Sequence, residues 1–369
     1  MKFLCPAVNF PPPFLRLGSR LLLASVGLAL GACSTQYRVV AVPEKTMAEE
    51  SARTGGSLRW HKQRDGRMAL DLKSFRTRPS VRIGVLNYSD RLGVPQLDAR
   101  INGQSQRCVL DTGCAVPVAM DFYTARTLGL KLFPVSKINL TAQGAASEQI
   151  KCAFALADRF ELAGIVDFRN MPTVILPRQY VYTRKVVGIP VVLRRIPLSL
   201  LGVSLFRGLS YLSFNSATKT VTFSTEQRFA PSPGADWVPM IWDGDQVYVQ
   251  ISVGRQNFKV RLDSGSSGAV DLPGSASVAG VSVRTVEPAI SLDRVSVIHE
   301  TLVNSVRLGT CVVPSVKVAQ SPSGNGLLGY GLLRRYRFTL DFQRNVLWLE
   351  ALEPARASML RPQKIAVAR

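Results

Sequence analysis

A short motif that occurs twice constrains this chain more than any other feature. The first copy is Asp-Thr-Gly at Asp111–Gly113, and the second is Asp-Ser-Gly at Asp263–Gly265. Each copy follows a short apolar-rich run, so each aspartate is expected where a strand ends in a tight turn. Asp and Gly are ordinary turn residues, and a single copy would indicate only a turn. The duplication, with one copy in each half of the chain, favours a functional pair of carboxylates.

The sequence around the two motifs repeats as well. Upstream of each motif, an alternating segment is typical of a strand that turns at a glycine. Downstream, each half has an apolar segment with a proline, then Leu-Leu-Gly, then a closing hairpin. In order, the matched segments are Leu97–Gly103 with Val249–Gly254, Met171–Leu176 with Val313–Val318, Leu200–Gly202 with Leu327–Gly329, and Leu212–Phe223 with Leu340–Leu349. This shared order predicts two copies of one β-rich unit, at 94–225 and 240–351.

Two carboxylates held close together have a defined chemistry. At a separation of about 3 Å they cannot both ionise, so the pair shares one proton. One aspartate takes a proton from a water molecule while the other donates a proton to the substrate carbonyl. We expect Asp111 and Asp263 to form such a dyad, with hydroxyls that tie the two turns together and glycines that free the backbone. These supporting residues are Thr112, Gly113, Ser264 and Gly265.

The order of strand, Asp-Thr/Ser-Gly turn, flap hairpin, strand, Leu-Leu-Gly and closing hairpin resembles the retropepsin and pepsin group of aspartic peptidases. The closing segments Leu200–Phe223 and Leu327–Leu349 are especially similar to bacterial retropepsin-like domains, and the resemblance covers about two thirds of the 369 residues. It implies an all-β, bilobal acid-protease fold made of two retropepsin-like β-barrel lobes, with no cofactor and no metal ion. It also implies that Gly202 and Gly329 support the catalytic turns from behind.

The sequence departs from the family's pattern beside the first motif and in the flaps. Cys114 follows the first motif, where the family usually has Ser or Ala, whereas the second copy has the usual Ser266. The flap of the first copy is expected in the Gly/Ala-rich stretch Thr141–Ser147. Its substrate-binding residues are expected to be Gln143, Gly144 and Ala145. The corresponding stretch of the second copy, near Ser291–Val297, has no glycine, so we expect one working flap at most.

The N-terminus predicts export and a lipid anchor. Basic residues precede the apolar run Leu21–Ala32, which is too short to span a bilayer comfortably but suits a signal peptide. Leu30–Cys33 resembles a bacterial lipobox, and an ordinary signal peptide with an incidental cysteine is the alternative. Ser34 in the next position resembles lipoproteins sorted to the outer membrane. We therefore expect an outer-membrane lipoprotein that faces the periplasm of a Gram-negative envelope and is held by acyl chains on Cys33.

The chain is expected to have five parts. They are a lipoprotein signal peptide at 1–32, a tether at 33–80 with at most a short strand near Tyr37–Val42, a first lobe at 81–230, a second lobe at 236–352, and a basic tail at 353–369. Because both copies lie in one chain, we expect a monomer that acts as an intramolecular pseudo-dimer. The first copy also has an insertion in Arg178–Arg195, which is interpreted as a tolerated surface loop, with the cleft or the membrane as alternative neighbours.

The cysteines and the net charge leave alternatives open. Either Cys108 or Cys114 pairs with Cys152, or these three and Cys311 are free thiols in the core. The net charge of +21 falls by three, to +18, when the three basic residues of the signal peptide are removed. Export and the lack of a nucleic-acid motif argue against nucleic acid as a partner. The charge fits either the anionic envelope or a simply solvated basic surface.

Other classes of function have little support in the sequence. Gly324–Gly329 matches the dinucleotide-binding pattern, but too few residues follow it for the rest of a doubly wound sheet. His61 and His299 are the only histidines, which leaves little material for a His-dependent triad or a multi-His zinc site. The expected function is therefore hydrolysis of peptide or protein substrates by an aspartic endopeptidase. The alternative is a bilobal, peptide-binding envelope lipoprotein that keeps the shape without catalysis.

Overall fold

Strands dominate the computed structural model of the chain. The structure describes residues 35–54, 60–62, 68–70, 76–79, 83–133, 140–143, 149–162, 166–186, 189–276, 278–290, 295–321 and 326–352. The expected signal peptide, lipidation site and basic tail therefore lie outside the described residues. Within the described parts, no helix combines the length and the apolar character needed to cross a bilayer.

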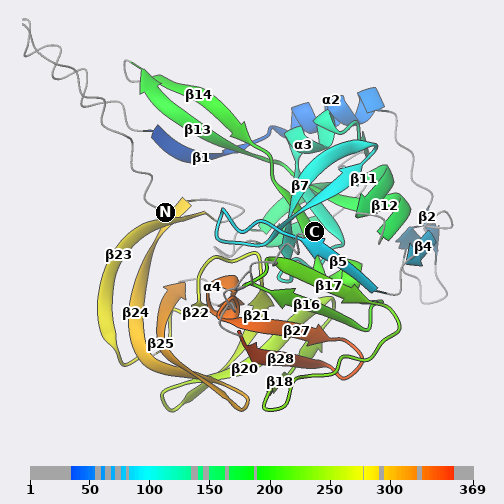
Figure 1. The fold of residues 1–369 in the computed structure, drawn as a ribbon. Coiled ribbons are helices and arrows are strands. Elements are labelled where there is room, and N and C mark those ends of the chain that lie inside the picture. The colour runs from blue at the N-terminus through cyan, green and yellow to red at the C-terminus, as the bar shows by residue number, and fades with distance from the viewer. Residues whose placement is uncertain are drawn as a thin grey trace, which may run out of the picture.

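The first lobe is a closed β-barrel with additional strands at its rim (Figure 1). Its strands are β4 Arg76–Pro79, β6 Gln96–Ile101, β7 Gln104–Asp111, β8 Val118–Asp121, β9 Lys131–Leu132, β10 Leu140–Gln143, β11 Gln149–Leu162, β12 Val166–Leu176 and β15 Ser199–Gly202. The path β11-β6-β7-β15-β8-β12 is closed by the pairing of β11 with β12. Apolar side chains on alternate residues of these strands fill the barrel, as in the pattern of β6, where every second residue is buried.

The second lobe repeats this barrel. Its strands are β19 Ile241–Asp243, β20 Gln246–Val253, β21 Gln256–Asp263, β22 Val270–Pro273, β23 Val281–Ile290, β24 Val295–Leu308, β25 Cys311–Ser321 and β26 Leu327–Gly329. The path β24-β20-β21-β26-β22-β25 is closed by the pairing of β25 with β24. Strand by strand, this is the order of the first lobe. The expected all-β, two-barrel fold is therefore confirmed.

A third sheet joins the lobes, and both contribute to it. Its order is β18 (Asp236–Pro239), β28 (Val346–Ala351), β27 (Tyr336–Asp341), β16 (Tyr211–Asn215), β17 (Thr220–Ser224) and β5 (Ile83–Asn87). At its centre Ser213 pairs with Thr339, and the ring of Phe214 stacks on that of Phe338 with centroids 4.3 Å apart. One apolar core runs through both lobes and this sheet, so the lobes are held together by packing as well as by backbone hydrogen bonds.

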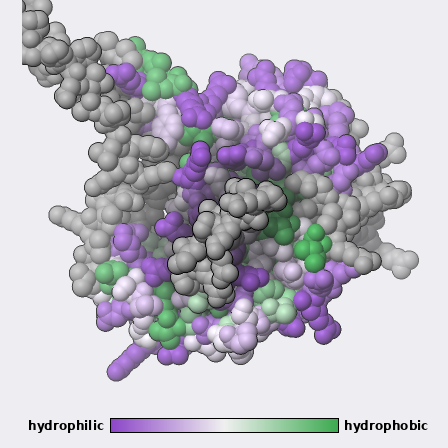
Figure 2. Space-filling view, viewed as in Figure 1, coloured by the Kyte–Doolittle hydropathy of each residue, from purple (hydrophilic) through white to green (hydrophobic). Residues whose placement is uncertain are grey.

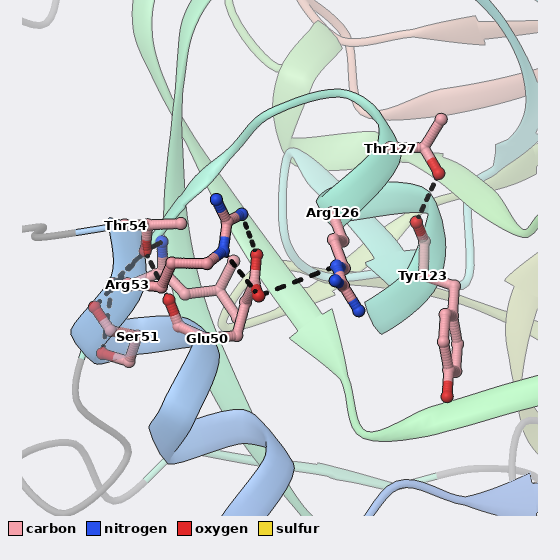
Figure 3. A network of polar contacts seen from close by, with 8 residues as sticks. Glu50, Ser51, Arg53, Thr54, Tyr123, Arg126 and Thr127 are labelled. Atoms are coloured by element: carbon pink, nitrogen blue, oxygen red, sulfur yellow. Dashed lines mark hydrogen bonds and ion pairs between the residues drawn. The ribbon is translucent and has the colours of Figure 1, made fainter.

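The segment before the first lobe is more structured than a tether. The expected short strand is β1, Thr35–Ala41, and it is followed by a helix, α2, Glu44–Thr54. Met47 of α2 is buried in the core of the first lobe. The buried Glu50 forms ion pairs with Arg53 and, at 3.7 Å, with Arg126 of helix α3, Phe122–Thr127 (Figure 3). For residues 35–54 the tether prediction is therefore wrong, because docking on the lobe orders them.

The insertion of the first copy is also regular, and its interpretation as a loop is wrong. It forms a hairpin of β13, Arg178–Val186, and β14, Ile189–Ile196. β13 pairs on its other side with β1, which gives the three-stranded sheet β1-β13-β14 that projects from the first lobe in Figure 1. A further small hairpin joins β2, Trp60–Lys62, to β3, Met68–Leu70.

Candidate active site

The ends of two equivalent strands place the two aspartates. β7 ends at Asp111 in the first lobe, and β21 ends at Asp263 in the second. The Leu-Leu-Gly strands lie beside them in parallel, with Gly202 next to Asp111 and Gly329 next to Asp263. A Cβ atom added at Gly202 would lie 2.0 Å from the carbonyl oxygen of Val116. Glycine is therefore required where the supporting strand passes behind the turn.

The glycine of each turn lies against the carboxyl group of the other. A Cβ atom added at Gly113 would lie 2.6 Å from Cγ of Asp263, and one added at Gly265 would lie 2.5 Å from Cγ of Asp111. The two carboxyl groups are thus brought together from residues 152 positions apart in the sequence. The backbone N–H of Gly113 donates to Oδ1 of Asp111 at 2.9 Å, which fixes the orientation of that carboxyl group.

Two hydroxyl groups tie the turns to each other, as the sequence predicts. The N–H of Thr112 donates to Oγ of Ser264 at 3.0 Å, and the N–H of Ser264 donates to Oγ1 of Thr112 at 2.9 Å. Each hydroxyl then donates across to the other lobe, Thr112 to the carbonyl of Leu262 and Ser264 to that of Leu110. Both hydroxyl residues are buried. This reciprocal set of bonds sets the distance between the lobes at the dyad.

Burial and mutual repulsion control the protonation of the pair. Burial raises the pKa of Asp111 well above its usual range, and the neighbouring charge of Asp263 raises it further, against the opposing influence of Arg261 and the N–H of Gly113. Asp263 is 8% exposed, and its Oδ1 accepts no hydrogen bond from the described residues. An oxygen of Asp263 is therefore left for a water molecule or another ligand.

An arginine beside the dyad distinguishes the second lobe from the first. Nη2 of Arg261 lies 3.6 Å from Oδ2 of Asp263, and the arginine side chain is 15% exposed. Its buried Nε has no hydrogen-bond partner among the described residues. The corresponding position of the first lobe, two residues before Asp111, is Val109. Arg261 is a site residue that was not predicted, although a basic residue between Val260 and Leu262, just before the second motif, is visible in the sequence.

No disulfide joins the four cysteines of the described residues, which are Cys108, Cys114, Cys152 and Cys311. The alternative of a disulfide to Cys152 is therefore not realised. Cys114, the unusual residue after the first motif, is partly buried, and its thiol donates to the carbonyl of Val116 at 3.5 Å. Burial, followed by the nearby charge of Asp111, raises the pKa of Cys114. The thiol beside the dyad is therefore neutral and packs as a small apolar group.

Hairpins stand at the expected flap position in both lobes. In the first lobe, β10 and β11 pair from Leu140 with Cys152 to Gln143 with Gln149. Gln143 is thus the last residue of β10, whereas Gly144 and Ala145, at the tip, lie outside the described residues and their role stays a prediction. In the second lobe, β23 and β24 pair in the same place. The prediction of a single working flap is therefore not tested, although flap strands are present in each lobe.

Comparisons with known proteins give a limited picture. No protein-family model matches the sequence, and no curated protein does. Among solved structures, the chain is similar to the crystal structure of a retropepsin-like aspartic protease from Rickettsia conorii, with 18% identity and a TM-score of 0.25. That match covers 40% of this chain and 93% of the other. The strand order of the two barrels defines the class of fold here, which is the two-lobed, retropepsin-like one. No three potential metal ligands gather within the described residues.

Proposed function

We propose that the protein is an aspartic endopeptidase that hydrolyses peptide bonds through Asp111, Asp263 and an activated water molecule. The observation that carries the proposal is the pair of turns in which each glycine lies against the other aspartate's carboxyl group. The reciprocal bonds of Thr112 and Ser264 support it, because a pair of buried carboxyls is held together only by a rigid frame. The proposed mechanism uses neither a metal ion nor a cofactor.

The surroundings of the two aspartates assign different roles to them. Asp111 holds the proton, since burial raises its pKa, and it donates that proton to the carbonyl oxygen of the scissile bond. Asp263 has an oxygen without a partner in the described chain, and it accepts a proton from the attacking water. The proton balance closes when Asp263 gives its proton to the leaving amine and Asp111 takes a proton back from a hydroxyl of the tetrahedral intermediate as that intermediate collapses to the carboxylic acid. Arg261, 3.6 Å from Asp263, stabilises the negative charge that remains on the pair.

The same arginine is the observation that favours a second candidate function. A cation beside the pair also suits an acidic ligand, so a peptide-binding lipoprotein without catalysis would use the same site to hold a carboxylate. The two candidates differ in one respect. The peptidase loses cleavage but keeps peptide binding when Asp111 becomes Asn, whereas the binding protein shows no cleavage in any form.

The test compares cleavage of a mixed peptide library by the wild type, Asp111→Asn and Asp263→Asn between about pH 3 and pH 7, the range in which a carboxylate pair works. Asp243→Asn is the matched control, because the exposed carboxylate of Asp243 pairs only with Lys259 in the described structure. We expect wild type and control to cleave and both dyad variants to lose at least about 100-fold in rate. Cleavage by either dyad variant at the control's rate would exclude the mechanism, and a wild type that binds peptides without cleaving them would establish the second candidate.

We also propose that Cys33 carries acyl chains that hold the protein on the periplasmic face of the outer membrane. The lipobox-like Leu30–Cys33 after an apolar run supports this proposal. Cys33→Ser is expected to leave unprocessed or mislocalised protein. Mass spectrometry of the mature N-terminus decides the matter, since an unmodified terminus at another residue contradicts the proposal.

A further inference from the structure

The sheet β1-β13-β14 has a surface unlike the rest of the molecule. On its outer strand β14 the side chains from Ile189 to Arg195 are all exposed. The exposed apolar residues of the sheet are Val40, Tyr182, Ile189, Val191, Val192 and Leu193. Figure 2 shows apolar and hydrophilic residues side by side at the upper left, where Figure 1 places this hairpin. Monomeric proteins rarely leave such a patch uncovered in water, so the patch indicates a contact with something apolar.

A β-bulge interrupts the pairing of β14 with β13. Tyr182 pairs with Arg194 and the next residue of β13, Thr183, pairs with Val192, so Leu193 is the extra residue. A bulge bends its strand and breaks the alternation of side chains between the two faces. Val192 is 52% exposed and Leu193 is 55% exposed. The hairpin thus presents two adjacent apolar side chains at a bend.

The charge of the same sheet has one sign. Residues 35–41 and 178–196 contain no Asp or Glu, and their basic residues are Arg38, Arg178, Arg184, Lys185, Arg194 and Arg195. A long apolar edge strand is ordinarily a template for pairing with another copy. Two copies of this edge would bring like charges together, which disfavours such a pair. Apolar side chains flanked by cations instead fit an anionic lipid surface, where headgroups bind the cations and acyl chains receive the apolar groups.

The position of the sheet in the chain points to the same partner. β1 begins at Thr35, two residues after Cys33, the residue on which we propose acylation. A lipid on Cys33 would therefore hold the start of β1 within roughly 7 Å of the lipidated residue. Thr183 pairs with both Gln36 and Val192, so Val192 lies across the sheet from this end of β1. We propose that the β13–β14 hairpin is a membrane-contacting element that inserts Val192 and Leu193 among the lipids and binds anionic headgroups through its arginines. This function does not depend on whether the dyad cleaves peptides.

The test measures how close the hairpin lies to lipid in the full chain. Val192→Trp and, as matched control, Val312→Trp are each reconstituted in phosphatidylcholine vesicles with or without phosphatidylglycerol, and brominated acyl chains serve as the quencher. Val312 is an equally exposed valine, at 49%, on β25 of the second lobe. The emission of each variant is read as its difference from the wild type, whose own tryptophans are the common background. We expect a blue shift and quenching for Trp at 192, stronger with phosphatidylglycerol, and neither for Trp at 312.

Charge reversal separates the electrostatic contribution. The substitutions Arg184→Glu and Arg194→Glu are combined with Val192→Trp in one variant. They are expected to reduce the quenching of Trp at 192 to the level of the Val312→Trp control. Arg255→Glu with Arg307→Glu makes the same change in net charge on exposed positions of the second lobe and is expected to leave the quenching in place. Equal quenching of Trp at 192 and Trp at 312 overturns the proposal. So does quenching at 192 that changes neither with phosphatidylglycerol nor with replacement of the hairpin arginines. Circular dichroism confirms that each variant is folded.

Discussion

The first and second lobes place an aspartate at the same point of the same barrel, yet they surround it differently. Val109 precedes the first motif at the position that Arg261 occupies before the second. The first lobe also adds the helix α3 and the hairpin β13–β14, which have no counterpart among the described residues of the second. The shared barrel supplies the pair of carboxyl groups. The divergence between the copies makes the surroundings of the two aspartates unequal and gives only the first lobe the hairpin that we propose contacts the membrane.

The largest effect is expected where the lobes are most alike. Gly113→Ala adds a methyl group at a point 2.6 Å from Cγ of Asp263, and Gly265→Ala does the same to Asp111 at 2.5 Å. Either change displaces a reacting carboxyl by about 1 Å, which costs roughly 100-fold in rate. Gly208→Ala is the control, because a Cβ atom there meets nothing within 4 Å. The steady-state rate of peptide cleavage is measured for all three variants. A large difference in rate between Gly113→Ala and Gly265→Ala would show that the two turns are not equivalent.

A second prediction tests the frame that joins the lobes. Thr112→Val and Ser264→Ala each remove a buried hydroxyl that accepts from one N–H and donates to one carbonyl. Each is expected to lower the free energy of unfolding by about 1–3 kcal/mol, because buried polar groups are left without partners. Urea denaturation measures both losses. If the two losses in unfolding free energy differ by more than the experimental error, one of the two hydroxyl groups contributes most of the stability of this connection between the lobes.

A third prediction concerns the charge that separates the lobes. Arg261→Val makes the second lobe equal to the first at this position. The cation of Arg261 opposes the rise in the pKa of Asp111, so its loss raises that pKa further. The upper limb of the pH–rate profile, where the shared proton is lost, is therefore expected to move to higher pH. Arg255→Val, in an exposed turn, is the control. An upper limb of the Arg261→Val profile that stays in place or moves to lower pH contradicts the role given to Arg261.

The smallest effect is expected on stability. The folded-state pKa of Asp111 lies above its unfolded value. The stability that the group contributes is thus fully present below the unfolded pKa and is lost as the pH rises through the folded pKa. Asp111→Asn lacks this loss, so at pH 7 it is expected to melt at a higher temperature than the wild type. The difference should narrow towards pH 4, and a difference that widens instead would reverse the assigned protonation.

Much of the barrel and the pair of turns was predictable because local patterns fix them. Asp-Thr/Ser-Gly after an apolar run specifies a strand and a turn, and Leu-Leu-Gly marks the strand behind it. The closing hairpins show the limit of such patterns. In the alignment of the two copies from sequence, Leu212 was equivalent to Leu340. In the structure the turns of the two closing hairpins follow Asn215 and Asp341, which makes Leu212 equivalent to Phe338 instead. A shift of two residues leaves every side chain on the same face of a strand, so alternation could not detect it.

Features that depend on docking could not be predicted from local patterns. Helix α2 has few apolar residues, and it is held by the burial of Met47 and the ion pairs of Glu50, whose partner Arg126 is distant in the sequence. The edge strand β14 is exposed along its length, so it lacks the alternation by which strands are recognised. Arg261 is recognised as part of the site only because its guanidinium lies close to Asp263, and the sequence does not show this distance.

The central claim is that one chain builds one site from two unequal lobes. The most direct measurement is the specific activity of an equimolar mixture of Asp111→Asn and Asp263→Asn, set beside each variant alone. Because β16 pairs with β27 inside the chain and one core runs through both lobes, the mixture is expected to be as inactive as its components. Recovered activity in the mixture would show that lobes of different chains combine. Activity in either variant alone would show that like lobes pair across two chains, and both results contradict the account.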